Sequence, residues 1–296
     1  MILWEELLNV DGETYQIFGR IFTPETHVKS EGSLKFKNSQ KYQIYEHIRK
    51  DKSGGGLAVG VSKNLSPFWL HDGGNEVEAM TIKASFKNLE IRIINGYGPQ
   101  EYDPELKKTL FWNYLENELL ECHMEGSGCI LLMDSNAWLG QELIQNDPHK
   151  QNKNGELLHN FLKRNPQMHL LNASSICNGL ITRSRNLENR SERSVIDFVI
   201  VCDRVRPYMT IFIVDEKKAF PLANFSKKKI SYSDHNSLIG FLELKIQKTK
   251  MERKVIFDYK KNESIDNFKR MTNENENLIN IFSNNFCLKY KFGGNK

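Results

Sequence analysis

The sequence predicts an α/β fold whose sheets are mixed or antiparallel rather than doubly wound. Several apolar, strand-like runs follow one another with no helix between them, for example 77–86 and 89–97. Two other segments, 104–121 and 155–165, carry the apolar stripe of an amphipathic helix. Strands alternate with helices in a doubly wound fold, so this order of elements favours a mixed or antiparallel sheet.

The composition indicates a protein with a sizeable core. The 296 residues are 39% hydrophobic, enough for one large domain or one domain with an appendage. The net charge is only +4, so any nucleic-acid binding must come from local basic clusters. No apolar run approaches the roughly 20 residues that span a bilayer, and the N-terminus lacks the basic start of a secretory signal. The five scattered cysteines form no CxxC pair, which favours an intracellular setting.

The individual elements follow from local patterns. The first clear strand, LAVGV at 57–61, lies between glycine-rich turns. The helix predicted over 104–121 opens at Pro104, and the helix predicted over 155–165 stops before Pro166, because proline favours the first turn of a helix and cannot continue one. Later strands are predicted at 168–172, 194–201, 208–214 and 237–246.

The two ends of the chain differ from its middle. WEELLNVDG at 4–12 predicts a first helix. From Gln247 the chain becomes charged and rich in asparagine, with one helical segment around 265–282. We therefore expect a main domain over 1–246, followed by a charged linker with a helix over 247–296.

Polar residues gather where predicted strands begin or end. The buried run CILLM leads directly into Asp134 and Asn136. Four other stretches also place polar residues at the start or end of an apolar strand, namely PETH at 24–27, NGYGP at 95–99, SVID at 194–197 and SDH at 233–235. Strand ends of one sheet can converge on one edge, so these residues are candidates for a common site. An acid such as Asp197, between Ile196 and Phe198, is costly to bury without a partner.

These residue types suit phosphodiester hydrolysis. Glu25, with Asp134 or Asp234, offers hard oxygen donors that prefer Mg²⁺ or Mn²⁺ to zinc. His235 can exchange a proton near neutral pH, with a neighbouring carboxylate fixing its tautomer. Asn136 and Tyr97 can bind a phosphate oxygen without adding negative charge. The motifs GxxxxGK[ST], GxGxxG, HExxH and GxSxG are absent, which removes the main competing chemistries.

The ordered series PETH, NGYGP, DSNAW, SVIDF and SDH, over residues 25 to 235, resembles the endonuclease/exonuclease/phosphatase superfamily. Within it, the chain is most similar to the apurinic-type endonuclease domain of non-LTR (LINE-like) retrotransposon proteins. The resemblance implies a four-layer α/β sandwich, with two mixed sheets face to face and helices outside. It also implies that Glu25 binds the divalent metal and that Asp234 lies near it.

The same resemblance assigns roles to the other motif residues. Tyr97 would contact the scissile phosphate, and Asn136 would hold that phosphate. Asp134 would position or deprotonate the attacking water. Asp197 would orient His235, which would stabilise the charge that develops on the phosphate.

The chain departs from this family in three ways. Members usually begin with a strand that carries an asparagine at the metal site, whereas only twenty-four residues precede Glu25 here. With a helix predicted at 4–12, we expect that first strand to be missing. Met133 and Ser135 replace the usual Gly and Phe beside the catalytic Asp. The tail after Gln247 resembles the linker that leads to a reverse transcriptase in such elements, so the element's RNA and reverse transcriptase are further possible partners.

Each motif residue also has a purely structural interpretation. Asp134 and Asn136 belong to types common in turns after strands. His235 can be a surface histidine beside a capping residue, Tyr97 can pack a turn, and Glu25 can lie in a plain loop. The ordered series favours the catalytic interpretation for Asp134 and His235, and leaves Tyr97 open.

Two basic clusters flank the motifs, where DNA phosphates would have to lie. We expect Arg183 and Arg185, with the adjacent Thr182, to contact DNA, although charged runs are usually solvated faces. The same alternatives stay open for Lys227–Lys229. For Trp138, packing in the core is favoured over stacking on a base.

Three functions follow, in order of preference. The first is a metal-dependent DNA endonuclease of a retrotransposon-type protein that nicks one strand, with nuclear residence expected from the resemblance. The second is an inactive remnant that at most binds nucleic acid. The third is a phosphatase or phosphodiesterase on a small phosphoester. The sequence does not indicate an oligomeric state.

Overall fold

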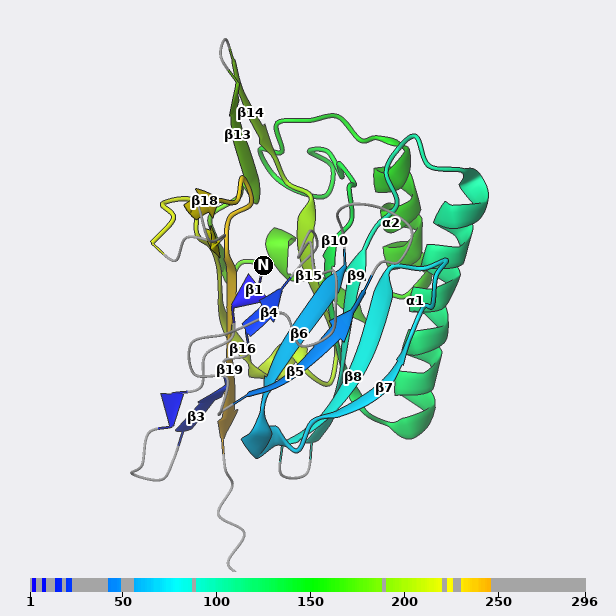
Figure 1. Cartoon of the computed structure of the whole chain (residues 1–296), viewed down its shortest axis with the longest axis vertical. Coiled ribbons are helices and arrows are strands. Elements are labelled where there is room, and N and C mark those ends of the chain that lie inside the picture. The colour runs from blue at the N-terminus through cyan, green and yellow to red at the C-terminus, as the bar shows by residue number, and fades with distance from the viewer. Residues whose placement is uncertain are drawn as a thin grey trace, which may run out of the picture. The chain divides into compact units, whose positions relative to one another are not determined.

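Two β-sheets lie face to face in the protein (Figure 1). The computed structural model describes residues 42–48, 56–86, 89–187, 190–219 and 230–245, and the strands at 2–3, 7–8, 14–17, 20–22 and 223–225. The predicted linker over 247–296 lies outside the described residues. None of the described helices is long and apolar enough to cross a membrane.

The smaller sheet has six strands in the order β11-β15-β10-β9-β8-β7. Its central strands β9 (Leu89–Tyr97) and β10 (Gly128–Asp134) are parallel, and β15 (Asp197–Cys202) runs antiparallel to β10. The outer strands are β7 (Phe68–Asp72), β8 (Ala79–Phe86) and β11 (Met168–Leu170). All seven residues of β10 are buried, which explains its continuous apolar run.

The larger sheet has nine strands, with the central order β12-β16-β19-β1-β4-β6-β5. It contains β1 (Ile2–Leu3), β4 (Arg20–Phe22), β5 (Tyr42–His47), β6 (Leu57–Ser62), β12 (Cys177–Asn178), β16 (Met209–Val214) and β19 (Leu238–Lys245). Strand β3 (Thr14–Ile17) pairs with β19 and with β2 (Leu7–Leu8). Two separate hairpins are β13 (Arg183–Leu187) with β14 (Arg190–Ser194), and β17 (Ala223–Phe225) with β18 (Ile230–Tyr232).

Alternation along the strands builds two apolar layers. In β10, Ile130 and Leu132 face the core between the two sheets, where they join Phe212 of β16. Leu131 and Met133 face the other way, into the layer beneath the helices. The period of two therefore lets one strand serve both layers.

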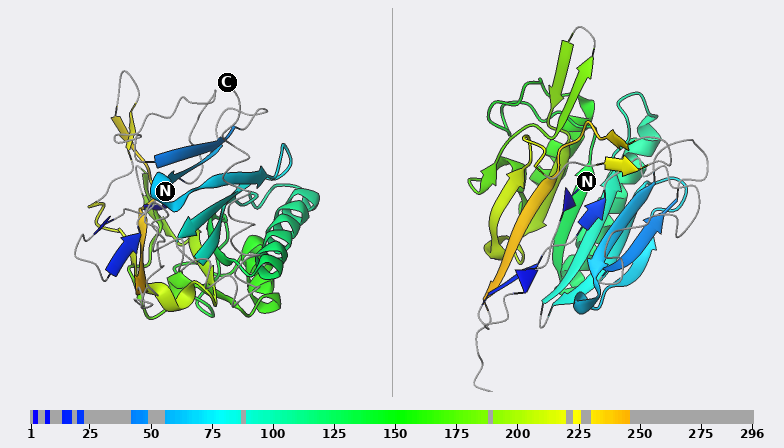
Figure 2. Two further views of the ribbon diagram at one scale, coloured as in Figure 1. Left: turned by 90° about the horizontal axis from the view of Figure 1, so that it is seen from below. Right: turned by 60° about the vertical axis from the view of Figure 1, so that its left-hand side comes forward.

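Helices α1 (Glu105–Glu125) and α2 (Lys153–Arg164) cover the outer face of the six-stranded sheet (Figure 2). Phe111 and Phe161 are fully buried in that layer. Both helices were predicted, and the mixed α/β sandwich is confirmed. Among the residues that the structure describes, no α-helix covers the larger sheet, so three of the four expected layers are seen.

The N-terminal expectation was wrong. Leu7–Leu8 is a strand paired with β3 and not part of a helix. Ile2–Leu3 also forms a strand, between β19 and β4. Tyr15 and Gln16 of β3 pair with Leu7–Leu8 on one side and with β19 on the other, so this strand pairing overrides the helical spacing of the local apolar residues.

Candidate phosphoesterase site

Three strand ends bring polar residues together at one edge of the six-stranded sheet. Asp134, the last residue of β10, is the cross-strand partner of Asp197, the first residue of β15. On its other side, Asp134 is paired in register with Tyr97, the last residue of β9. The parallel and antiparallel pairings thus place all three residues in one row.

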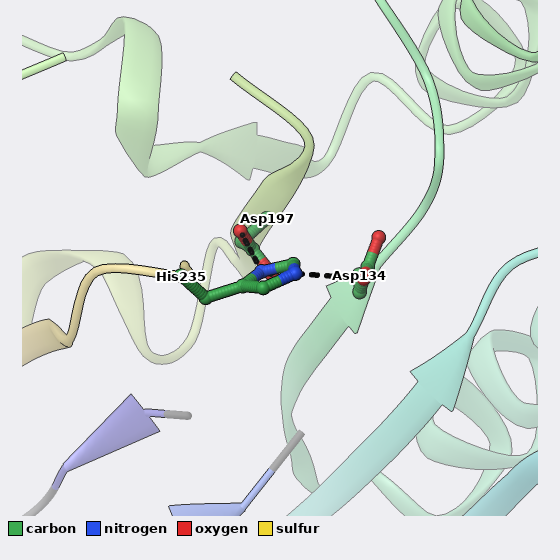
Figure 3. Close-up of side chains that lie close together, drawn as sticks. All are labelled: Asp134, Asp197 and His235. Atoms are coloured by element: carbon green, nitrogen blue, oxygen red, sulfur yellow. Dashed lines mark hydrogen bonds and ion pairs between the residues drawn. The ribbon is translucent and has the colours of Figure 1, made fainter. Parts of the chain in front are cut away.

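His235 reaches this row from the other sheet, three residues ahead of β19. Its Nδ1 lies 2.9 Å and 3.1 Å from the two carboxylate oxygens of Asp197 (Figure 3). Its Nε2 points towards Asp134, 3.9 Å from Oδ2. Asp134 and Asp197 are buried, with exposed fractions of 3% and 1%. The sequence-predicted catalytic acids and imidazole therefore form one cluster.

Burial and mutual charge set the protonation of this cluster. Burial, and then the charge of Asp197, raise the pKa of Asp134 to about 7. Burial would also raise the pKa of Asp197, but the charge and hydrogen bond of His235 outweigh it and lower that pKa. For His235, burial alone would lower the pKa, yet Asp197 raises it to about 9. At neutral pH, His235 is an imidazolium held by Asp197, with its Nε2–H directed towards Asp134.

Thr182 and Asn172 hold the backbone of Asp197 in place through hydrogen bonds. The Thr182 hydroxyl accepts hydrogen bonds from the backbone N–H groups of Ile196 and Asp197, at 2.9 Å and 3.1 Å. Asn172 donates its side-chain amide to the Asp197 carbonyl. Thr182 is completely buried. The expectation that its side chain contacts DNA was therefore wrong, because the hydroxyl is used inside the protein.

Asn136 lies in a turn with a left-handed backbone, at φ 50°. Its backbone N–H donates to Asp134 Oδ1 at 3.1 Å, and its side-chain amide donates to the Gly98 carbonyl at 2.9 Å. Asparagine tolerates this conformation better than most residues. The turn thereby fixes one oxygen of Asp134 and leaves the other facing His235.

Two further asparagines at the start of α2 support the Asn136 turn. Asn152, the N-cap of the helix, and Asn154 both donate their side-chain amides to the Asn136 carbonyl, at 3.3 Å and 3.2 Å. Asn154 also donates to the Pro99 carbonyl at 2.7 Å. Gly155 is required here, because an added Cβ would lie 1.9 Å from the Trp138 carbonyl oxygen. The capping position of Asn152 was a usable signal in the sequence, whereas nothing local distinguished Asn154.

Tyr97 packs in the core and also lies beside the acidic cluster. Its ring packs against the core between the sheets, and its hydroxyl accepts a hydrogen bond from the Gln100 side chain at 2.5 Å. It stands beside Asp134 in the strand register. Both interpretations of Tyr97 thus remain compatible with its place in the fold.

Asp234 and Arg183 form an ion pair at the rim of the cluster. Arg183 Nε donates to Asp234 Oδ2 at 2.9 Å, and Asp234 Oδ1 lies 3.9 Å from His235 Nε2. Arg185 is exposed two residues farther along β13, on the hairpin that projects beyond the sheets (Figure 1). Arg193 instead pairs with Glu216. Of the predicted DNA contacts, Arg183 therefore lies in the site itself and Arg185 beside it.

Trp138 does not pack in the core, contrary to expectation. Its half-buried ring stacks on His149, with ring centroids 4.2 Å apart and planes inclined by 12°. His149 Nε2 in turn lies 2.8 Å from the Arg193 carbonyl. The stacked rings thus link the turn after Asn136 to the β13–β14 hairpin.

The donor set suits a hard divalent cation. Asp134, Asp197 and His235 each offer a ligand atom within 4.8 Å of the others. Asp197 is engaged by His235 and Asp234 Oδ2 by Arg183, so of these three carboxylates Asp234 Oδ1 and the oxygens of Asp134 are left for a metal or for water bound to it. Mg²⁺ commonly takes one or two protein carboxylates together with water and phosphate oxygens, which fits this set. The predicted ligand Glu25 lies outside the described residues.

The chain has the fold of the endonuclease/exonuclease/phosphatase superfamily. The 3′-5′ exonuclease NExo from Neisseria meningitidis superposes with a TM-score of 0.50 and 14% identity, over 75% of this chain and 87% of that chain. A structure of 3′ phosphatase NExo from Neisseria bound to product DNA hairpin gives the same values. The endonuclease domain of TRAS1, a telomere-specific non-LTR retrotransposon, has a TM-score of 0.48 and 16% identity, over 70% of this chain and 82% of that chain. No protein-family model matches the sequence, and no curated protein matches it significantly.

Replacing Thr182 by valine should destabilise the fold at the site. Valine keeps the shape but removes the acceptor, leaving two buried N–H groups without it. We expect the free energy of unfolding to fall by about 1–3 kcal/mol in urea denaturation. Thr182→Ser keeps the hydroxyl and is the matched control. A valine variant as stable as the wild type would contradict this role.

Replacing Asp197 by asparagine should lower the pKa of His235. In the metal-free protein, NMR should follow the His235 ring through a pKa of about 9. Without the charge and hydrogen bond of Asp197, only Asp134 still opposes the effect of burial, so the pKa of His235 should fall clearly below that of the wild type. The His169 ring, which contacts Asp203 away from the cluster, reports in the same spectrum that the variant is folded. An unchanged His235 titration would show that Asp197 does not control it.

Proposed function

We propose that the chain is a metal-dependent DNA endonuclease that nicks one strand by hydrolysing a phosphodiester bond. The observation that carries the proposal is the cluster of Asp134, His235 and Asp197. In it, a buried acid faces an imidazolium that a second acid holds in place. The cluster lies at the strand ends of a fold that is shared with an exonuclease and phosphatase.

The cluster supplies the groups that this reaction needs. Asp134, with a pKa near neutrality, positions the attacking water and accepts its proton. His235 places a positive charge near the phosphate, where negative charge develops. Bound Mg²⁺ or Mn²⁺, held by Asp234 and by Glu25, would supply charge neutralisation at the phosphate oxygens. Asn136 and Tyr97 flank the same phosphate.

DNA is the substrate that the surroundings of the site favour. Arg183 and Arg185 lie on the β13–β14 hairpin next to Asp234, where phosphates on either side of the cut would lie. One solved neighbour was bound to a product DNA hairpin. The retrotransposon origin, and a reverse transcriptase as partner, rest on the five ordered motifs of the sequence.

One alternative has specific support. The resemblance implies an asparagine at the metal site on a strand ahead of the Glu25 motif, and the described strand β1 consists of Ile2 and Leu3. This favours an inactive remnant as the second candidate.

Purified protein should convert supercoiled plasmid to nicked circles in the presence of Mg²⁺. His235→Ala and Asp134→Ala should each lower the nicking rate by about 10²–10⁴-fold, the usual contribution of a positioned acid or base. His169→Ala is the matched control. In the strand register His169 is opposite Val201, far along β15 from Asp197, and its side chain contacts Asp203. The absence of nicking by the intact protein would argue for a remnant. Hydrolysis of small phosphoesters alone would argue for the third function.

Calorimetric titration should detect Mg²⁺ binding and assign its ligands. Glu25→Gln and Asp234→Asn should each weaken the affinity by about tenfold or more, because carboxylate charge dominates binding of a hard cation. Asp203→Asn, an exposed acid paired with His169, is the control. Equal affinities in all four proteins, or no binding, would contradict the proposed metal site.

A further inference from the structure

Arg183 brings a guanidinium group into the acidic cluster. Its Nε donates to Asp234 Oδ2 at 2.9 Å, and the side chain is two-thirds buried. The other oxygen of Asp234, Oδ1, lies 3.9 Å from His235 Nε2. The guanidinium group of Arg183 is thus joined to the cluster through Asp234.

The backbone around Arg183 is fixed to the segment that carries His235. Arg183 and His235 form an isolated antiparallel bridge. On either side, the Ser184 N–H donates to the Asp234 carbonyl at 2.7 Å, and the Asn236 N–H donates to the Thr182 carbonyl at 2.6 Å. The backbone of Arg183 is therefore held at the base of the hairpin, next to the backbone of His235.

The chemistry of a guanidinium suits the reacting phosphate. It carries five N–H donors in a planar fork, and it keeps its charge at any pH of interest. With Nε on Asp234, the terminal Nη groups can bind two oxygens of one phosphate. Such a bidentate contact neutralises the charge that builds up on the phosphate during attack.

We propose that Arg183 is a further catalytic residue, which binds the nonbridging oxygens of the reacting phosphate while Asp234 holds its guanidinium in place. This inference rests on the proposed phosphodiesterase function and deepens it. It assigns Arg183 to the phosphate that is cut, whereas Arg185 remains a contact to a neighbouring phosphate of DNA. A substrate with one phosphate and no flanking nucleotides separates the two roles.

The test compares hydrolysis of bis(p-nitrophenyl) phosphate with nicking of supercoiled plasmid. Arg183→Ala should lower kcat on the small diester by about 10²–10³-fold, as loss of one charge-stabilising donor does. Arg183→Gln, which keeps most of the side-chain volume, should do the same. Arg183→Lys should recover only part, because lysine lacks the fork. Arg190→Ala, an exposed hairpin arginine paired with Glu192, is the matched control with unchanged turnover. Added guanidinium ion should restore turnover to Arg183→Ala and not to His235→Ala.

Two results would overturn the inference while leaving the proposed function intact. One is an Arg183→Gln variant that hydrolyses the small diester at the wild-type rate and is weakened only in salt-dependent binding of duplex DNA, measured by anisotropy in EDTA. The other concerns the double variant that combines Arg183→Gln with Asp234→Asn. If this variant hydrolyses the small diester no more slowly than either single variant, and added guanidinium ion does not restore turnover to Arg183→Ala, then Arg183 only supports Asp234. A wild-type protein inactive on both substrates would reject the proposed function, and this inference with it.

Discussion

The site depends on keeping two acids buried opposite each other in one strand pair. Asp134 and Asp197 are cross-strand partners and both are almost completely buried, so their charges repel in a poorly solvated place. His235 relieves this repulsion, because its positive charge lies 2.9 Å from one acid and 3.9 Å from the other. The repulsion that remains, together with burial, raises the pKa of Asp134 to about 7, within the range useful for a base at neutral pH.

The imidazole and the acids come from different sheets, so the packing between the sheets sets the geometry of the site. Asp134 and Asp197 belong to the six-stranded sheet, and His235 precedes β19 of the nine-stranded sheet. The apolar layer between the sheets, which includes Leu132 and Phe212, therefore fixes the distance between them. Each sheet also supplies supporting hydrogen bonds, which restrict the acids to one orientation and preorganise the site.

The sequence predicted the parts of the site that local patterns can reveal. Asp134 and Asp197 stood out because an acid interrupts or ends an apolar strand, and motif order connected them to His235. Thr182 and Asn154 act through hydrogen bonds to residues fourteen to fifty-five positions away, which no local pattern encodes. The helix predicted at 4–12 was wrong because Leu7–Leu8 pairs with β3, which in turn pairs with β19 near the other end of the domain. Trp138 was misplaced because an aromatic residue next to a strand resembles a core residue until its stacking partner, His149, is known.

The charges of the cluster bear on how the proposed metal and phosphodiester would bind together. Three carboxylates, of Asp134, Asp197 and Asp234, face one imidazolium and one guanidinium. With all three acids ionised, negative charge is in excess, and partial protonation of Asp134 reduces it at neutral pH. A phosphodiester would add to this excess and a divalent cation would reduce it, so in this low-dielectric position each should favour binding of the other.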